Sequence, residues 1–194
     1  MTYRQVACGL LLILACKGDD GIDSGLPPDK TGDQLMPAEQ TSLCDASNEY
    51  LTSHISESDW KGYLCTLDSL GDAEGADVSA KIAACKQLRA DCIAAPSDDT
   101  LGSTCDDVDD WSTCGASVAE IEGCLTDSID LLDGLISDFT CDILDPARAM
   151  AVQEKYGDAV TDPFPASCDV VQAKCPTLLG GGDDPQAGQS GDSL

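Results

Sequence analysis

The chain has 194 residues and a net charge of −26 at pH 7, from 36 acidic and 10 basic residues. A surface this acidic repels nucleic acid and anionic lipid headgroups, so we expect no nucleic-acid partner. No two of the 12 cysteines are closer than seven positions apart, which excludes the close pairs of zinc ribbons, thioredoxin-like enzymes and covalent haem sites. We therefore expect no cofactor, and cysteines that serve the structure.

The first 15 residues have the order of a secretory signal. A positive charge at Arg4 is followed by an apolar run over residues 6–15 that contains Cys8. This run is shorter than the roughly 20 residues of a membrane-spanning helix. The segment is therefore predicted to direct export rather than to cross the membrane.

The residues Ile13-Leu14-Ala15-Cys16 resemble the lipobox of bacterial lipoproteins. This resemblance implies a lipoprotein signal peptide over residues 1–15 and a mature chain that begins at Cys16, which carries acyl chains such as palmitate. It implies anchoring in the bacterial cell envelope, and Lys17 favours the outer membrane because an Asp at this place would favour the inner one. Two alternatives stay open: a signal cleaved before Cys16 without lipidation, and an N-terminal helix of the fold.

Residues 17–43 are rich in Gly, Pro, Asp and Ser and have no sustained helical or strand period. We expect residues 16–43 to be a lipidated N-terminus followed by a flexible acidic tether, about 30 Å in mean reach. Residues 176–194 are predicted to be a disordered tail. Between them, residues 44–175 have a normal length for one cysteine-rich domain.

This domain is predicted to be all-α, a disulfide-stapled irregular bundle of about four to five helices. Residues 45–70 have helical spacing with a break near Ser58. Asp77 is expected to cap a helix that Pro96 closes. The apolar positions of that helix predict a buried stripe of Val78, Ile82, Cys85, Leu88 and Cys92.

Three more helices follow in the second half of the domain. Ser117 and Glu120 form a capping-box pattern at the start of a helix that places Val118, Ile121, Leu125, Leu132 and Leu135 on one side. Asp145-Pro146 predicts a helix over residues 147–156, with Gly157 as its stop. A short last helix is expected over residues 167–174, before Pro176.

Ten cysteines are predicted to form disulfides, each contributing typically 2 to 4 kcal/mol in a domain with few aromatic residues. Cys85 and Cys92 lie on one helix with α-carbons about 10.5 Å apart, beyond the roughly 7 Å limit for a bridge. The same reasoning excludes a bridge between Cys168 and Cys175 if their segment is helical. The pair that we expect most is Cys105 with Cys114. The ten are Cys44, Cys65, Cys85, Cys92, Cys105, Cys114, Cys124, Cys141, Cys168 and Cys175.

Two groups of residues could carry chemistry. The acidic segment between Cys105 and Cys114 offers Asp106, Asp107, Asp109 and Asp110 as weak candidate ligands for calcium. His54 is the only histidine, and it could act as a base for Ser53 or Ser56, but no oxyanion-hole signature accompanies it. We expect His54 to be an exposed polar residue of a helix.

The chain as a whole resembles the cysteine-rich, helical lipoproteins predicted in bacterial genomes. The resemblance implies export and membrane anchoring, and it assigns no catalytic residue. The sequence thus predicts an envelope lipoprotein with a structural or binding role and an unidentified protein or cation partner. The alternatives are a calcium-dependent interaction module and, without any distinctive motif, a hydrolase that uses a carboxylate pair.

Overall fold

The computed structural model describes residues 21–96, 101–102, 105, 111–161 and 164–176. Six α-helices and four short 3-10 helices make up the regular structure of these residues, and no strand is found among them beyond one isolated bridge between Thr31 and Ser117. The all-α, disulfide-stapled fold is therefore confirmed. The α-helices are α1 Pro37–His54, α2 Glu57–Asp72, α3 Val78–Ala94, α4 Val118–Asp138, α5 Pro146–Thr161 and α6 Asp169–Lys174.

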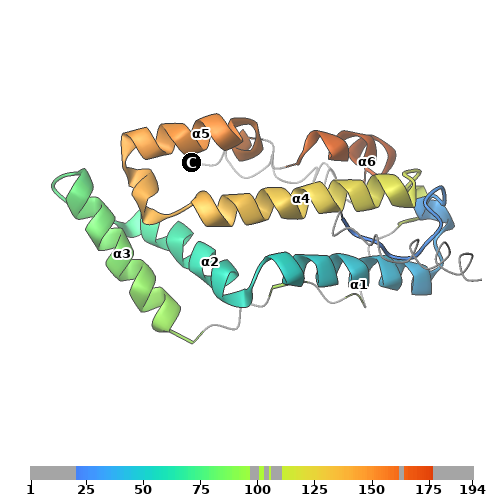
Figure 1. Cartoon of the computed structure of the whole chain (residues 1–194), viewed down its shortest axis with the longest axis horizontal. Coiled ribbons are helices and arrows are strands. Elements are labelled where there is room, and N and C mark those ends of the chain that lie inside the picture. The colour runs from blue at the N-terminus through green and yellow to red at the C-terminus, as the bar shows by residue number, and fades with distance from the viewer. Residues whose placement is uncertain (1–20, 97–100, 103–104, 106–110, 162–163, 177–194) are drawn as a thin grey trace, which may run out of the picture.

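The long helix α4 runs through the middle of the bundle (Figure 1). It has α1 along one side and α5 and α6 along the other. The pair α2 and α3 lies at the end where α4 finishes, next to the 3-10 helix η3 (Cys141–Leu144). At the opposite end, η1 (Gly32–Gln34) packs beside η2 (Trp111–Thr113).

Local capping explains where the best-predicted helices begin. Ser117 accepts a hydrogen bond from the Glu120 N–H through its Oγ, and Glu120 Oε2 accepts one from the Ser117 N–H at 2.8 Å. Asp77 Oδ1 accepts from the Ala80 N–H at 2.9 Å in the same way. These side chains satisfy N–H groups that the first turn of a helix leaves without partners.

The expected stop at Gly157 is wrong, because α5 continues to Thr161. Gly157 does not adopt the positive φ of a C-terminal cap. Glycine inside a helix costs only about 1 kcal/mol relative to alanine, so it does not end a helix by itself. The break expected near Ser58 occurs at Ile55 and Ser56, between α1 and α2.

The flexible tether expected up to residue 43 is wrong from residue 21 onward. The Gly32 N–H donates to the Ala116 carbonyl at 2.9 Å, and the Asp33 N–H donates to the Cys114 carbonyl at 2.8 Å. Ile22 is 8% exposed, and α1 already begins at Pro37. This segment packs in extended form against the start of α4, so periodicity in its sequence could not reveal it.

The main core surrounds the first half of α4. It is built from few large side chains, because four of its eleven buried members are half-cystines. These members are Leu35, Leu43, Trp111, Cys114, Ala116, Val118, Ile121, Cys124, Cys168, Val171 and Cys175.

Helix α3 departs from the expected buried stripe. Cys85 is its only buried residue, whereas Val78 and Leu88 are each 39% exposed. The helix therefore gains little from apolar burial and is held by other contacts. Lys61 of α2 supplies two of them, because its Nζ donates to the carbonyls of Ile93 and Ala95 at 2.8 and 2.6 Å, at the C-terminal end of α3.

All ten predicted cysteines are paired, and the expected Cys105–Cys114 bridge is wrong. As expected, Cys85 is not joined to Cys92 and Cys168 is not joined to Cys175. Cys114 instead lies against the C-terminal segment, where the Gly115 N–H donates to the Lys174 carbonyl at 3.0 Å. The five disulfides are Cys44–Cys105, Cys65–Cys92, Cys85–Cys141, Cys114–Cys175 and Cys124–Cys168.

Candidate functional site

The residues predicted to carry a lipid or to bind calcium lie outside the part of the chain that the structure describes. Cys16 and the four acidic candidates Asp106, Asp107, Asp109 and Asp110 fall outside the described residues, so their roles stay predictions. Within the described ranges, no group of histidine, cysteine or acidic side chains is arranged to hold a metal ion. No helix among these residues is long and apolar enough to cross a membrane.

His54 is exposed at the end of α1, as expected. Its Nδ1 lies 2.9 Å from the Tyr50 carbonyl oxygen and 3.0 Å from Ser53 Oγ, and its ring packs on Tyr50 with centroids 4.1 Å apart. Ser56 caps α2, where its Oγ accepts from the Asp59 N–H at 3.1 Å. These local contacts fit helix termination rather than a nucleophile with its base.

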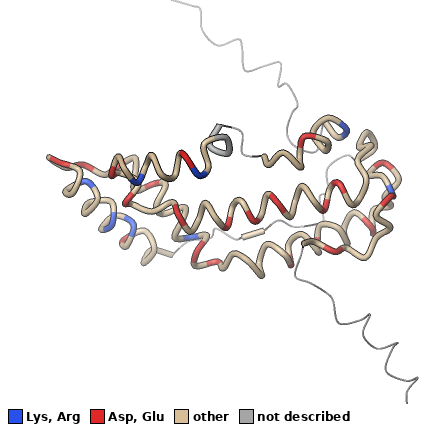
Figure 2. The backbone as a smooth tube through the Cα atoms, turned by 45° about the horizontal axis from the view of Figure 1, so that its top comes forward, with Lys and Arg blue, Asp and Glu red and all other residues tan. Residues whose placement is uncertain are grey.

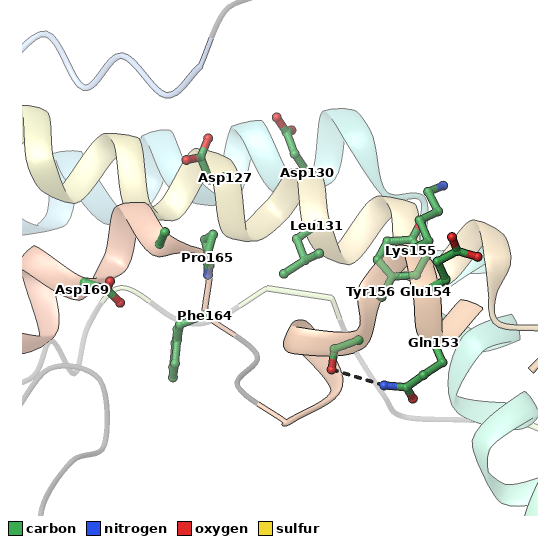
Figure 3. A pocket seen from close by; sticks show the side chains of 12 residues that line it. Asp127, Asp130, Leu131, Gln153, Glu154, Lys155, Tyr156, Phe164, Pro165 and Asp169 are labelled. Atoms are coloured by element: carbon green, nitrogen blue, oxygen red, sulfur yellow. Dashed lines mark hydrogen bonds between the residues drawn. The ribbon is translucent and has the colours of Figure 1, made fainter. Parts of the chain in front are cut away.

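A cavity of about 800 Å³ lies between α4, α5 and the 3-10 helix η4 (Ala166–Cys168). Figure 3 shows Asp127 and Asp130 on α4 and Glu154 on α5 around its rim. Lys155, the one cationic side chain in the lining, donates instead to Asp138 at 2.7 Å. The cavity is therefore acidic, and its potential favours cations over anions.

A second cleft of about 370 Å³ lies between α2, α3 and the end of α4, a volume within the roughly 300 to 1,000 Å³ of ligand pockets. We call it the Arg89 cleft. It combines one guanidinium, two carboxylates, small hydroxyl groups and aromatic rings. Its lining residues are Asp59, Gly62, Tyr63, Thr66, Arg89, Asp133, Ile136, Ser137, Phe139 and Thr140.

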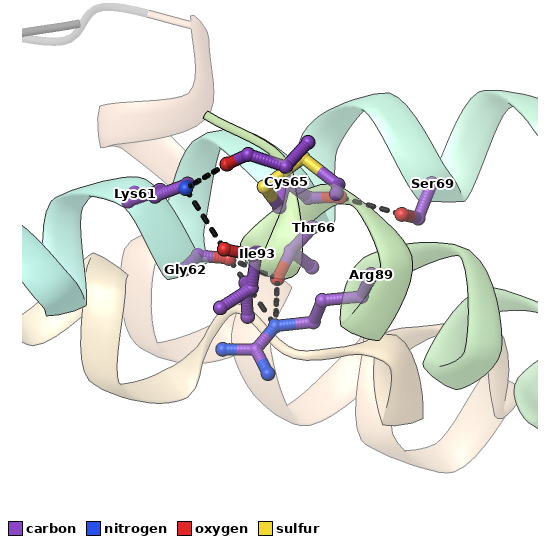
Figure 4. Close-up of a disulfide and its surroundings, with 9 residues drawn as sticks. Lys61, Gly62, Cys65, Thr66, Ser69, Arg89 and Ile93 are labelled. Atoms are coloured by element: carbon purple, nitrogen blue, oxygen red, sulfur yellow. Dashed lines mark hydrogen bonds between the residues drawn. A yellow bond between two sulfur atoms is a disulfide. The ribbon is translucent and has the colours of Figure 1, made fainter. Parts of the chain in front are cut away.

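The Arg89 side chain is held in place from one side (Figure 4). Its Nε donates to the Gly62 carbonyl at 3.2 Å and to Thr66 Oγ1 at 2.9 Å. Thr66 is 1% exposed and in turn donates to the Gly62 carbonyl at 2.7 Å. A Cβ at position 62 would lie 2.7 Å from Arg89 Nη2, so this helical glycine makes room for the guanidinium.

The two terminal nitrogens of Arg89 have no hydrogen-bond or ion-pair partner in the part of the chain that the structure describes. The fixed Nε therefore presents a guanidinium fork with unused donors. Such a fork matches the two oxygens of a carboxylate.

The cleft lies beside helix α3, which carries more basic than acidic residues. Figure 2 shows several basic residues along α3, whereas acidic residues are spread along the length of α4. Helix α3 carries Lys81, Lys86 and Arg89 against the single acidic residue Asp91. Lys86 is paired with Asp142 at 2.8 Å and Lys81 lies outside the cleft, so Arg89 is the basic side chain of α3 that can attract an anionic group into it.

Aromatic rings form one wall of the cleft. Tyr63 of α2 meets Phe139 edge to face with centroids 5.9 Å apart, and Trp60 stacks beside Tyr63 at 5.8 Å. Partial burial raises the pKa of the Tyr63 phenol, which keeps it neutral at physiological pH. The wall is thus uncharged and largely apolar.

Our sequence analysis missed this cleft. Its residues come from three helices and share no motif, and the one local signal was Gly62, a glycine inside a helix where alanine would be favoured. Searches with the chain find no matching protein-family model, no similar curated protein and no similar solved structure.

Proposed function

We propose that this protein is an extracytoplasmic lipoprotein, anchored to a membrane through a lipid on Cys16, with a binding or structural role. The observation that carries the proposal is the pairing of all ten cysteines between positions 44 and 175. Disulfides persist in oxidising compartments such as the bacterial periplasm and the cell surface, and they are rare in the cytosol. The lipobox-like residues 13–16 supply the signal for export and anchoring.

The packed segment that begins at residue 21 changes how the domain would sit at the membrane. Four residues lie between Cys16 and Gly21, and the five steps from one to the other span at most about 18 Å in a fully extended chain. The domain would therefore be held close to the membrane surface, with the middle of α4, where Gly21 and Ile22 lie against Thr126, nearest to the anchor. Its acidic surface would keep it from adhering to anionic headgroups.

Lipidation is tested by growing cells that express the full-length chain with an alkyne analogue of palmitate. We expect the label and membrane fractionation to be lost in Cys16→Ser and retained in the matched control Cys8→Ser. Retention of both in Cys16→Ser would refute the lipid anchor.

Export is tested independently by thiol counting with a polyethylene-glycol maleimide. In lysates quenched before cell opening, we expect none of the ten domain cysteines to react until a reductant is added. Free domain thiols in freshly quenched cells would refute the extracytoplasmic location, whatever the result of the lipid labelling.

A further inference from the structure

We propose that the Arg89 cleft binds a free α-amino acid, with the ligand carboxylate on the terminal nitrogens of Arg89 and the ligand ammonium group facing Asp133 and Asp59. The inference deepens the binding role proposed above, and it does not depend on the lipid anchor. It rests on three features of the cleft: an oriented guanidinium, carboxylates that do not pair with it, and an apolar wall.

Arg89 would bind the carboxylate of the ligand. Contacts of its Nε with Gly62 and Thr66 fix the plane of the guanidinium without using the terminal nitrogens. An incoming carboxylate can accept two parallel hydrogen bonds from such a fork, and little side-chain entropy is lost because the arginine is already held.

The two acidic residues that line the same cleft would face the ammonium group of the ligand. Neither Asp59 nor Asp133 comes within 4.0 Å of a nitrogen of Arg89, so the positive and negative ends of the cleft stay separate. Asp133 has no hydrogen-bond or ion-pair partner among the described residues. Two carboxylates beside one guanidinium disfavour a dianion such as phosphate and favour a ligand that carries both charges.

The side chain of the ligand would lie against the remaining wall. Tyr63, Ile136 and Phe139 are half-buried and present apolar surface to the cleft. A volume of about 370 Å³ accommodates one amino acid with a medium or large apolar side chain. The acidic cavity beside α5 lacks an unpaired cation in the same position, because Lys155 is engaged by Asp138.

The test is isothermal titration calorimetry on the detergent-solubilised full-length protein, with L-leucine and L-phenylalanine as probes. We expect saturable binding of at least one of them. N-acetyl-L-phenylalanine, which lacks the ammonium charge, and L-phenylalaninamide, which lacks the carboxylate, should each bind more weakly than the parent. Absence of binding by both free amino acids at millimolar concentration would overturn the proposal, as would equal binding of inorganic phosphate.

Variants assign the two ends of the ligand. Arg89→Met should weaken binding of the free amino acid at least tenfold, since hydrogen bonds to charged groups contribute that much. Lys81→Met removes the same charge from the same helix outside the cleft and should leave affinity unchanged. Equal loss in both variants would overturn the proposal, because the effect would then come from the general potential of α3.

Asp133→Asn provides a second arm that does not depend on the folding of an Arg89 variant. This exposed position makes no hydrogen bond or ion pair with other described residues, so the substitution should not alter stability. We expect up to about fivefold weaker binding of L-phenylalanine and unchanged binding of its N-acetyl derivative. Unchanged affinity for the free amino acid would refute the assigned ammonium site.

Discussion

Removal of the Cys65–Cys92 disulfide should loosen the C-terminal half of α3 without unfolding the core. This bridge joins α2 to α3 across 27 residues, and the chain-entropy model gives about 3.5 kcal/mol for closing a loop of that length. Helix α3 buries only Cys85 and stays tied to η3 by the Cys85–Cys141 bridge, so few apolar contacts oppose opening of its C-terminal half once Cys65–Cys92 is gone. In the double variant Cys65→Ala with Cys92→Ala, amide hydrogen exchange in the C-terminal half of α3 should therefore accelerate by up to about 300-fold.

The same measurement on α4 provides the internal comparison. The core around Val118 and Ile121 does not include α3, so protection of α4 should change far less. A second double variant, Cys124→Ala with Cys168→Ala, removes a bridge inside that core, closes a loop of 44 residues, and should destabilise by about 4 kcal/mol. We expect this variant to accelerate exchange in α4. Equal acceleration of α3 and α4 in the Cys65/Cys92 variant would refute the independence of α3.

Three further predictions address the remaining contacts. Hydrogen bonds from Lys155, Tyr156 and Arg148 lower the pKa of Asp138 to about 2. The stabilisation from these bonds is complete above pH 3.8, the ordinary pKa of an aspartate, and is lost as the pH falls toward 2. Asp138→Asn should therefore flatten this part of a plot of melting temperature against pH. Gly32→Ala would place a Cβ 2.6 Å from Cys114 Sγ and should destabilise by about 1 to 3 kcal/mol in denaturant melts, whereas Gly123→Ala, with open space around it, should be neutral or stabilising. Lys61→Met removes the bonds to the last carbonyls of α3 and should cost about 1 kcal/mol in the same melts.

Local rules predicted much of the helical structure. Ser117 and Asp77 mark helix starts that depend on side chains within three residues, so the sequence pattern was sufficient. The packed segment over residues 21–36 could not be predicted, because its Gly32 and Asp33 N–H groups bond to carbonyls more than 80 positions away. A chain that is extended and rich in Gly and Pro has the same composition whether it is packed or free.

The disulfide pattern, too, could be predicted only in part. Helix geometry was enough to exclude a disulfide between Cys85 and Cys92, since both lie on α3. The true partners lie 27 to 61 residues apart and are set by how helices pack. The Arg89 cleft was missed for the same physical reason, because three helices must come together before Arg89, Tyr63 and Asp133 share one surface.

The weak burial of α3 links the disulfides to the Arg89 cleft. A helix that buries only Cys85 is placed by its disulfides and by polar contacts, and Arg89 takes part in those contacts while it also lines the cleft. The double variant Cys65→Ala with Cys92→Ala should therefore lose amino-acid affinity at temperatures where circular dichroism still reports full helix content. Unchanged affinity in that variant would mean that α2 and α3 stay in register without their shared bridge, and that the cleft does not depend on this disulfide.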